Sequence, residues 1–141
     1  MWYHGVIRQV TNLPVDYLIE KWIYDEYENM RPYQLKSLKQ QAKESIEGLS
    51  KDLRKSTPSK IFYASNLMNY AYLRLIGFHI KHNFIKPYNG TEFLNRGKSL
   101  AERTKREQED SFLGDIKMTN IWADTVGISS WFEWVDFENN K

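Results

Sequence analysis

Basic side chains dominate the middle of this 141-residue chain and supply its clearest capacity for chemistry. Residues 31–106 hold sixteen Lys and Arg against five Asp and Glu, while the stretches on either side carry net negative charge. Lys and Arg neutralise phosphates and release their counterions, which makes such binding salt-dependent. The sequence therefore predicts contacts with the phosphate backbone of a nucleic acid. The predicted contacts are Lys36, Lys39, Lys43, Arg54, Lys55, Arg96, Lys98, Arg103, Lys105 and Arg106.

Two aromatic residues lie among these cations in the sequence. Tyr88 and Phe93 are predicted to stack on unpaired bases beside the phosphate contacts. A second interpretation stays open, because a basic stretch also forms a solvated surface whose charge is balanced by neighbouring acids. Both interpretations fit the excess of positive charge in residues 31–106.

The C-terminal stretch has the opposite character. Residues 107–141 hold eight acidic and two basic side chains together with three tryptophans. Because Trp is enriched in interface hot spots, the sequence predicts a protein interface at Trp122, Trp131, Phe132 and Trp134. The acidic ends of one copy attract the basic middle of another, so a homo-oligomer is also predicted. The alternative function is a protein-binding effector or inhibitor, or a self-assembling structural subunit of the virion type.

A histidine followed by an Asn-Gly turn suggests a different, enzymatic chemistry. His82-Asn83-Phe84, then Asn89-Gly90 and Arg96, resembles the signature of Fic-type nucleotidyl transferases. In that family a His base precedes an anion-binding turn and arginines. This chain departs from the pattern, since Ile85 and Lys86 stand where the family carries its metal-binding acid.

Arg74 and His79 have the Arg-x4-His spacing that is typical of HEPN ribonucleases, and the chain resembles that family in being helical. Five residues on an α-helix place the two side chains about 140° apart. A structural interpretation stands beside this one. Polar residues recur on one stripe of the same helix, which predicts either a wet face or a buried hydrogen-bond network. The stripe consists of Ser65, Asn69, Tyr72, His79 and Asn83.

The stretch 121–130 resembles the turn of helix-turn-helix DNA-binding proteins, with Ala123 and Gly127 four residues apart. The helix that would read bases, residues 131–138, carries three acids and no base. Phosphates repel such a helix, so this corner is interpreted as a packing contact between two short helices.

Apolar periodicity and helix breakers predict an all-α chain. The predicted helices span residues 14–30, 33–55, 59–86 and 91–113, followed by two short helices in 115–138 around Gly127. Apolar side chains surround the whole circumference of 59–86, which is typical of a buried helix, and we expect Leu73 and Ile76 to be fully buried. The first dozen residues favour a strand, because Trp2, Val6 and Ile7 are β formers.

We therefore expect a helical bundle of about four long helices around the buried central helix 59–86, with a small C-terminal helical pair. One domain over residues 1–141 accommodates these elements, with 113–141 as an appended acidic, Trp-rich part. The absence of cysteine excludes disulfides, thiolate metal sites and cysteine nucleophiles.

The remaining features bear on location and class of protein. No apolar stretch reaches the roughly 20 residues of a membrane span. The N-terminus lacks the pattern of a signal peptide. The chain is thus expected in the cytoplasm, or in the host cytoplasm or virion if it is viral, without a membrane partner. Frequent Lys, Asn, Ile, Tyr and Phe suit an AT-rich phage or mobile element. A non-enzymatic protein without cofactor or metal is the prediction.

Overall fold

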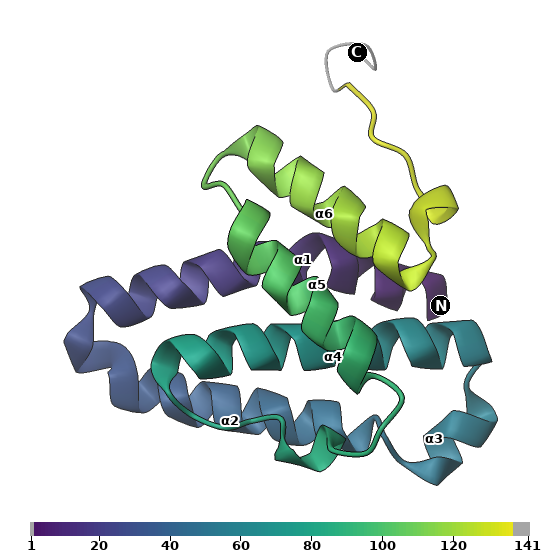
Figure 1. Cartoon of the computed structure of the whole chain (residues 1–141), viewed down its shortest axis with the longest axis horizontal. Coiled ribbons are helices and arrows are strands. Elements are labelled where there is room, and N and C mark those ends of the chain that lie inside the picture. Colours follow the sequence, from purple (N-terminus) through teal and green to yellow (C-terminus); the bar gives the residue numbers. More distant parts are fainter. Residues whose placement is uncertain (1, 137–141) are drawn as a thin grey trace.

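The computed structural model describes residues 2–136, and within that range the chain is helical with no strand (Figure 1). This confirms the all-α class. The α-helices are α1 (Trp2–Glu26), α2 (Arg31–Glu47), α3 (Lys51–Ser56), α4 (Ser59–Ile80), α5 (Leu94–Glu107) and α6 (Phe112–Val126). Short 3₁₀-helices follow α1, α4 and α6, namely η1 (Glu28–Met30), η2 (Lys86–Tyr88) and η3 (Ser129–Trp131).

Helix α4 is the centre of the bundle, as its all-round apolar pattern predicts. It packs against each of the other five α-helices, most extensively against α1 and α5. In Figure 1, α5 crosses in front of α4, α1 lies behind, α6 lies above, and α2 and α3 lie below. Leu73 is 1% exposed and Ile76 is fully buried, which confirms both predictions.

The polar stripe of α4 forms a hydrogen-bond network with α1. Nε2 of Gln9 donates to Oδ1 of Asn69 at 2.6 Å and to the carbonyl oxygen of Ser65 at 3.0 Å. Nearer the other end of α4, Nε2 of His79 donates to Oδ1 of Asp25 at 2.7 Å. Asn69 and His79 of the stripe thus bond to α1 while Asn83 is exposed, so the stripe combines features of both interpretations.

Helices α5 and α6 are joined by a buried polar contact. The indole Nε1 of Trp122 donates to Oγ1 of Thr104 at 2.8 Å, and both side chains are completely buried. This bond satisfies the one polar atom of Trp122, so the ring can be buried at no hydrogen-bonding cost.

The first helix is longer than the sequence predicts. Helix α1 runs without interruption from Trp2 to Glu26 with Pro14 inside it, so the strand predicted for the first dozen residues is wrong. Packing against α4 buries Val6 and Val10 and overrides the local preference for a strand. Nε2 of Gln108 donates to the carbonyl oxygen of Pro14 at 2.8 Å, which anchors this part of α1 to the α5–α6 connection.

Further helix boundaries differ from the prediction. The helix predicted over 91–113 is shorter, since α5 spans Leu94–Glu107 and α6 already begins at Phe112. Helix 33–55 is divided into α2 and α3 around Gly48, and Oγ of Ser50 caps α3 by accepting a hydrogen bond from the amide of Leu53 at 3.2 Å. The central helix ends at Ile80 rather than at residue 86. Lys81 adopts the left-handed conformation with φ 60°, and the amide of His82 donates back to the carbonyl oxygen of Gly77 at 2.9 Å. This is a helix-terminating motif that most often contains glycine.

Lys81→Gly is expected to raise the free energy of unfolding by roughly 1 kcal/mol, because glycine enters the left-handed region without the Cβ penalty. The matched control is Lys39→Gly, the same replacement inside the right-handed helix α2, which should lower it by roughly 1 kcal/mol. Urea denaturation measures both. A loss of stability in Lys81→Gly would mean that contacts of the lysine outweigh its backbone strain.

The C-terminal part forms one helix and not two. Helix α6 ends at Val126 and is capped by Gly127, whose φ of 77° favours glycine, and beyond η3 the chain is not helical through Asp136. The second helix of the predicted pair is therefore wrong for residues 128–136, and residues 137–141 lie outside the described part. Without that second helix the likeness to a helix-turn-helix also ends at Gly127. None of the helices between residues 2 and 136 is both long and apolar enough to cross a membrane.

Candidate nucleic-acid interface

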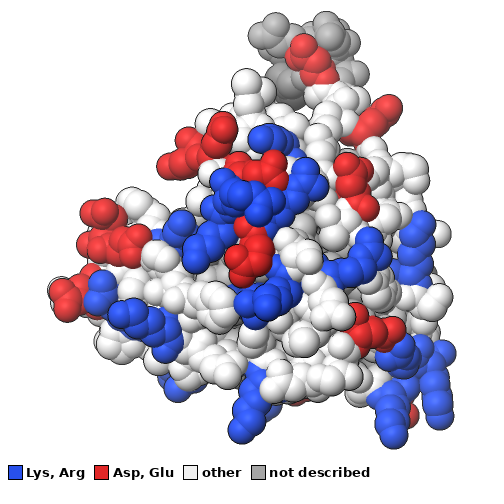
Figure 2. Space-filling view, viewed as in Figure 1, with Lys and Arg blue, Asp and Glu red and all other residues white. Residues whose placement is uncertain are grey.

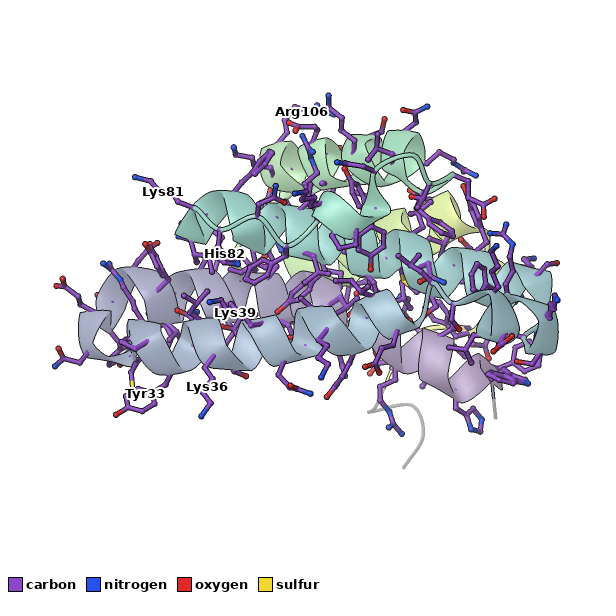
Figure 3. All side chains as sticks on the ribbon, turned by 90° about the horizontal axis from the view of Figure 1, so that it is seen from below. Tyr33, Lys36, Lys39, Lys81, His82 and Arg106 are labelled. Atoms are coloured by element: carbon purple, nitrogen blue, oxygen red, sulfur yellow. The ribbon has the colours of Figure 1, made fainter. Side chains whose placement is uncertain are left out.

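The cations predicted from the sequence do not share one face of the molecule. They come from α2, α3 and α5, which pack on different sides of α4. Figure 3 shows Lys36 projecting from α2 on one side of the molecule and Arg106 on the opposite side. A single rigid phosphate backbone cannot contact all of them together.

Several of these cations already form ion pairs or hydrogen bonds with other residues of the chain. Arg54 is ion-paired with Glu92, and Nε of Arg103 donates to Oε2 of Glu107 at 2.6 Å. This bond, with the charge of Arg103 and other nearby cations, holds the pKa of Glu107 below its usual value. Nη2 of Arg96 donates to the carbonyl oxygen of Thr125 at 2.8 Å, at the end of α6. Basic and acidic side chains alternate over α5 on the face seen in Figure 2, as expected of a balanced surface.

Other predicted cations have no acidic partner among the described residues and remain available to bind an anion. Within residues 2–136, none of their side chains has a carboxylate within 4.0 Å; they are Lys36, Lys39, Lys43, Lys55, Lys98 and Lys105. Arg106 is intermediate between the paired and the unpaired cations, since its Nη2 lies 3.9 Å from Oε2 of Glu107.

The predicted stacking residues are buried. Tyr88 packs edge-on against Tyr70, and Phe93 packs against Phe62 and Tyr63. Neither ring can meet a base, so this prediction is wrong. Both residues were assigned from their neighbours in sequence, but the loop after α4 folds back and inserts them into the core.

The predicted protein interface is only partly exposed. Trp122 is completely buried and belongs to the core, which corrects its assignment. Trp131 and Phe132 are half-buried, and Trp131 packs edge-on against Tyr3 of α1. Trp134 is half-exposed, and its indole Nε1 donates to Oδ1 of Asn120 at 2.8 Å.

The structure instead brings basic side chains together around the C-terminal end of α4. Three neighbouring cavities lie there, which we call cavities A, B and C and which together form the basic track. Cavity A, about 180 Å³, is lined by Tyr17, Arg74, Leu75, Phe78, His79, Ala101, Glu102 and Lys105. Cavity B, about 350 Å³, is lined by Leu73, Arg74, Gly77, Phe78, Lys81, His82, Asn83, Phe84 and Ile85. Cavity C, about 420 Å³, is lined by Tyr24, Arg31, Pro32, Gln34, Leu35, Ile80, Lys81 and His82.

Shared walls make the three cavities contiguous. Arg74 and Phe78 line both A and B, and Lys81 and His82 line both B and C. Glu102 is the one acidic residue among the side chains of the described chain that line the track. Figure 3 shows Lys81 projecting into solvent from the end of α4, with Lys36 and Lys39 on α2 visible from the same side.

An exposed aromatic ring stands in the middle of the track. Phe78 is 56% exposed, and the guanidinium of Arg74 lies over its ring at 4.4 Å from the centroid. A large apolar ring left in solvent beside cations suits stacking on a base. Phe78 thus has the exposure that Tyr88 and Phe93 lack.

The fold brings together the residues of one enzyme-like motif and separates those of the other. Arg74 and His79 line the same cavity, A, despite their separation on the helix. His82 and Asn83 line cavity B, but Arg96 lines none of the three cavities and is bound to the end of α6. The arginine that the Fic-like pattern requires is thus turned away from the histidine.

Of the residues that line the basic track, only Lys105 is among the phosphate contacts that the sequence predicts. The sequence predictions do not include Arg31 and Lys81, and they assign Arg74, His79 and His82 to catalytic or structural roles rather than to phosphate binding. One signal could have found most of them, because no acidic residue occurs between Asp52 and Glu92. That acid-free stretch contains Arg74, Lys81 and Lys86 together with both histidines.

No family model, no curated protein and no solved structure matches this chain.

Proposed function

We propose that this protein binds nucleic acid along the basic track, with the phosphate backbone passing around the C-terminal end of α4. The single observation that carries the proposal is the contiguity of cavities A, B and C, whose lining holds four Lys or Arg, two His and one acid. Cations in concave surroundings focus a positive potential, which attracts a polyanion from a distance.

The features of the track favour a single strand. Phe78 offers a ring between two groups of cations, and Tyr33, on the outer side of α2, is 70% exposed. Bases of a duplex are stacked on one another and unavailable to such rings, whereas unpaired bases stack readily on aromatic side chains. Lys36 and Lys39 lie on α2, the helix that supplies Gln34 and Leu35 to cavity C, and remain proposed phosphate contacts.

The double variant Lys81→Gln/Lys105→Gln tests the track directly. We expect its affinity for a single-stranded oligonucleotide to fall roughly tenfold at 50 mM salt, because two phosphate contacts are lost. The slope of log affinity against log salt should become shallower by about 1.4, since each contact to a single strand contributes about 0.7. Fluorescence anisotropy over a salt series gives both values.

The matched control is Lys55→Gln/Lys98→Gln, which removes the same charge from cations that also have no acidic partner but lie outside the track. Its affinity should stay within about twofold of the wild type. Equal losses in the two double variants would assign binding to the whole basic middle, as the sequence predicted. No detectable binding by the wild type at 50 mM salt would refute the proposal.

A second candidate function, protein binding, is favoured by a group of exposed apolar residues at the α1–α2 connection. Trp22 and Tyr27 form an edge-to-face pair with centroids 5.1 Å apart, and both are about half-exposed. Met30 and Tyr33 are exposed nearby in the chain. Trp22, Tyr27 and Met30 recur in the sequence at the spacing of one helix face, yet the fold leaves them in solvent. Molar mass in solution, with and without nucleic acid, separates this candidate from the first.

A further inference from the structure

Arg74 is the cation of the basic track with a buried N–H donor that lacks a hydrogen-bond partner in the described chain. Its side chain is only 14% exposed. Nη1 donates to the hydroxyl of Tyr70 at 3.3 Å, and Nη2 lies 3.6 Å from Oε1 of Glu102, beyond hydrogen-bond distance. Nε is buried and has no partner within residues 2–136. A guanidinium has five N–H donors, and burying it without acceptors is costly, so the site is incomplete as it stands.

The other walls of cavity A complete a set of donors around Arg74. His79 is held in place by its hydrogen bond to Asp25, and Lys105 has no carboxylate within 4.0 Å in the described chain. Burial raises the pKa of Tyr17, and the charge of Asp25 adds to the effect. The hydroxyl of Tyr17 therefore keeps its proton at neutral pH and can donate.

Glu102 does not block an anion from this site. Its side chain is 52% exposed and forms a loose ion pair with Arg74 at 3.6 Å, so an anion that binds Arg74 would displace Glu102 into solvent. Arg74, Lys105 and the hydroxyl of Tyr17 thus supply donors to cavity A, while the Nε2 of His79 is already bonded to Asp25.

The size of cavity A selects a small ligand. Its volume of about 180 Å³ corresponds to roughly six water molecules of about 30 Å³ each. A phosphoryl group fits such a space, whereas a nucleoside needs a cavity of a few hundred Å³. Cavity B, on the other side of Phe78, has about 350 Å³.

We propose that cavity A binds the terminal phosphate monoester of a nucleic-acid strand, with the adjoining base stacked on Phe78 at cavity B. This rests on the proposed function and adds that one strand end is recognised. A terminal phosphate carries up to two negative charges near pH 7, whereas a backbone phosphate carries one. The two cations of cavity A, Arg74 and Lys105, therefore favour the end of a strand over its interior.

The test compares three single-stranded oligonucleotides of one sequence, with a 5′-phosphate, a 3′-phosphate or hydroxyl groups at both ends. We expect one phosphorylated form to bind the wild type roughly tenfold more tightly than the hydroxyl form, the value of one charged hydrogen-bonded contact. Inorganic phosphate at millimolar concentration should abolish that preference, while chloride at equal ionic strength should not. These measurements need no variant.

Two variants locate the effect in cavity A. Arg74→Met keeps the length of the buried side chain without its donors, and Lys105→Gln changes an exposed residue whose loss does not threaten folding. Each should reduce the preference for a phosphorylated end to within about twofold, while Lys98→Gln should retain it.

The outcomes separate this inference from the proposed function. Equal, salt-dependent binding of all three oligonucleotides by the wild type would overturn the terminal-phosphate site and leave the nucleic-acid proposal standing. A preference that survives in Lys105→Gln would overturn it as well. Binding of none of the oligonucleotides would refute both.

Discussion

Leu73→Ala is expected to lower the free energy of unfolding by about 2–5 kcal/mol, the range for a leucine removed from a packed core. Leu73 lies in the middle of α4, which packs against each of the other five α-helices, and it is 1% exposed. The variant loses the transfer free energy of the side chain and leaves a cavity that surrounding helices cannot readily fill. Chemical denaturation, with an unchanged dependence on denaturant, measures the loss.

The matched control is Leu53→Ala, the same replacement in the short helix α3, where the leucine is 42% exposed. It should cost less than about 1 kcal/mol, because most of the removed surface is already in contact with water. A loss of under half a kcal/mol in Leu73→Ala would show that α4 is not the centre of the bundle.

Gly97→Ala should lower the free energy of unfolding by about 1–3 kcal/mol, although alanine is the better helix former. Gly97 lies where α5 crosses α4, directly over the ring of Tyr70. A Cβ placed there would overlap Cδ1 of that ring and lie 2.9 Å from Cε1. Tyr70 is completely buried and packed against Tyr88, so its ring has no free space to enter.

Gly5→Ala in α1 is the control for this variant. A Cβ at Gly5 would meet no atom within 4 Å, so only the difference in helix propensity remains. We expect stabilisation of up to about 1 kcal/mol, and thermal or chemical denaturation of both variants should give opposite signs. Stabilisation by Gly97→Ala as well would contradict the close crossing of α4 and α5.

The core could be predicted where the sequence repeats one physical signal many times. Helix α4 is apolar on all sides over 22 residues, and such a helix is stable in water only when others surround it. The ends of the helices are harder to predict than the core, because each end depends on one or two residues. Lys81 stops α4 in a conformation that lysine rarely adopts, and nothing local to the sequence marks that position.

The apolar stripe of α1 shows a second limit of prediction from the sequence. Its spacing indicates one buried face over residues 14–30, yet Ile19 and Trp22 are about half-exposed. Periodicity shows that apolar side chains share a face, but the positions of neighbouring helices decide which part of that face is covered. Val10, Leu13 and Tyr17 are buried, so neighbouring helices cover the first part of α1 more fully than its end.

By itself, the sequence determined the helical class, the central place of α4 and the excess of positive charge in the middle of the chain. Only the tertiary structure decided which cations have acidic partners and which share a cavity. Charge is counted along the chain, but binding depends on distances between side chains from separate helices. Lys105 and Arg74 are thirty-one residues apart in sequence and line one cavity, whereas Arg103, two residues from Lys105, is paired with Glu107. The 3.6-residue turn of α5 separates those two neighbours, and the crossing of α5 over α4 brings the distant pair together.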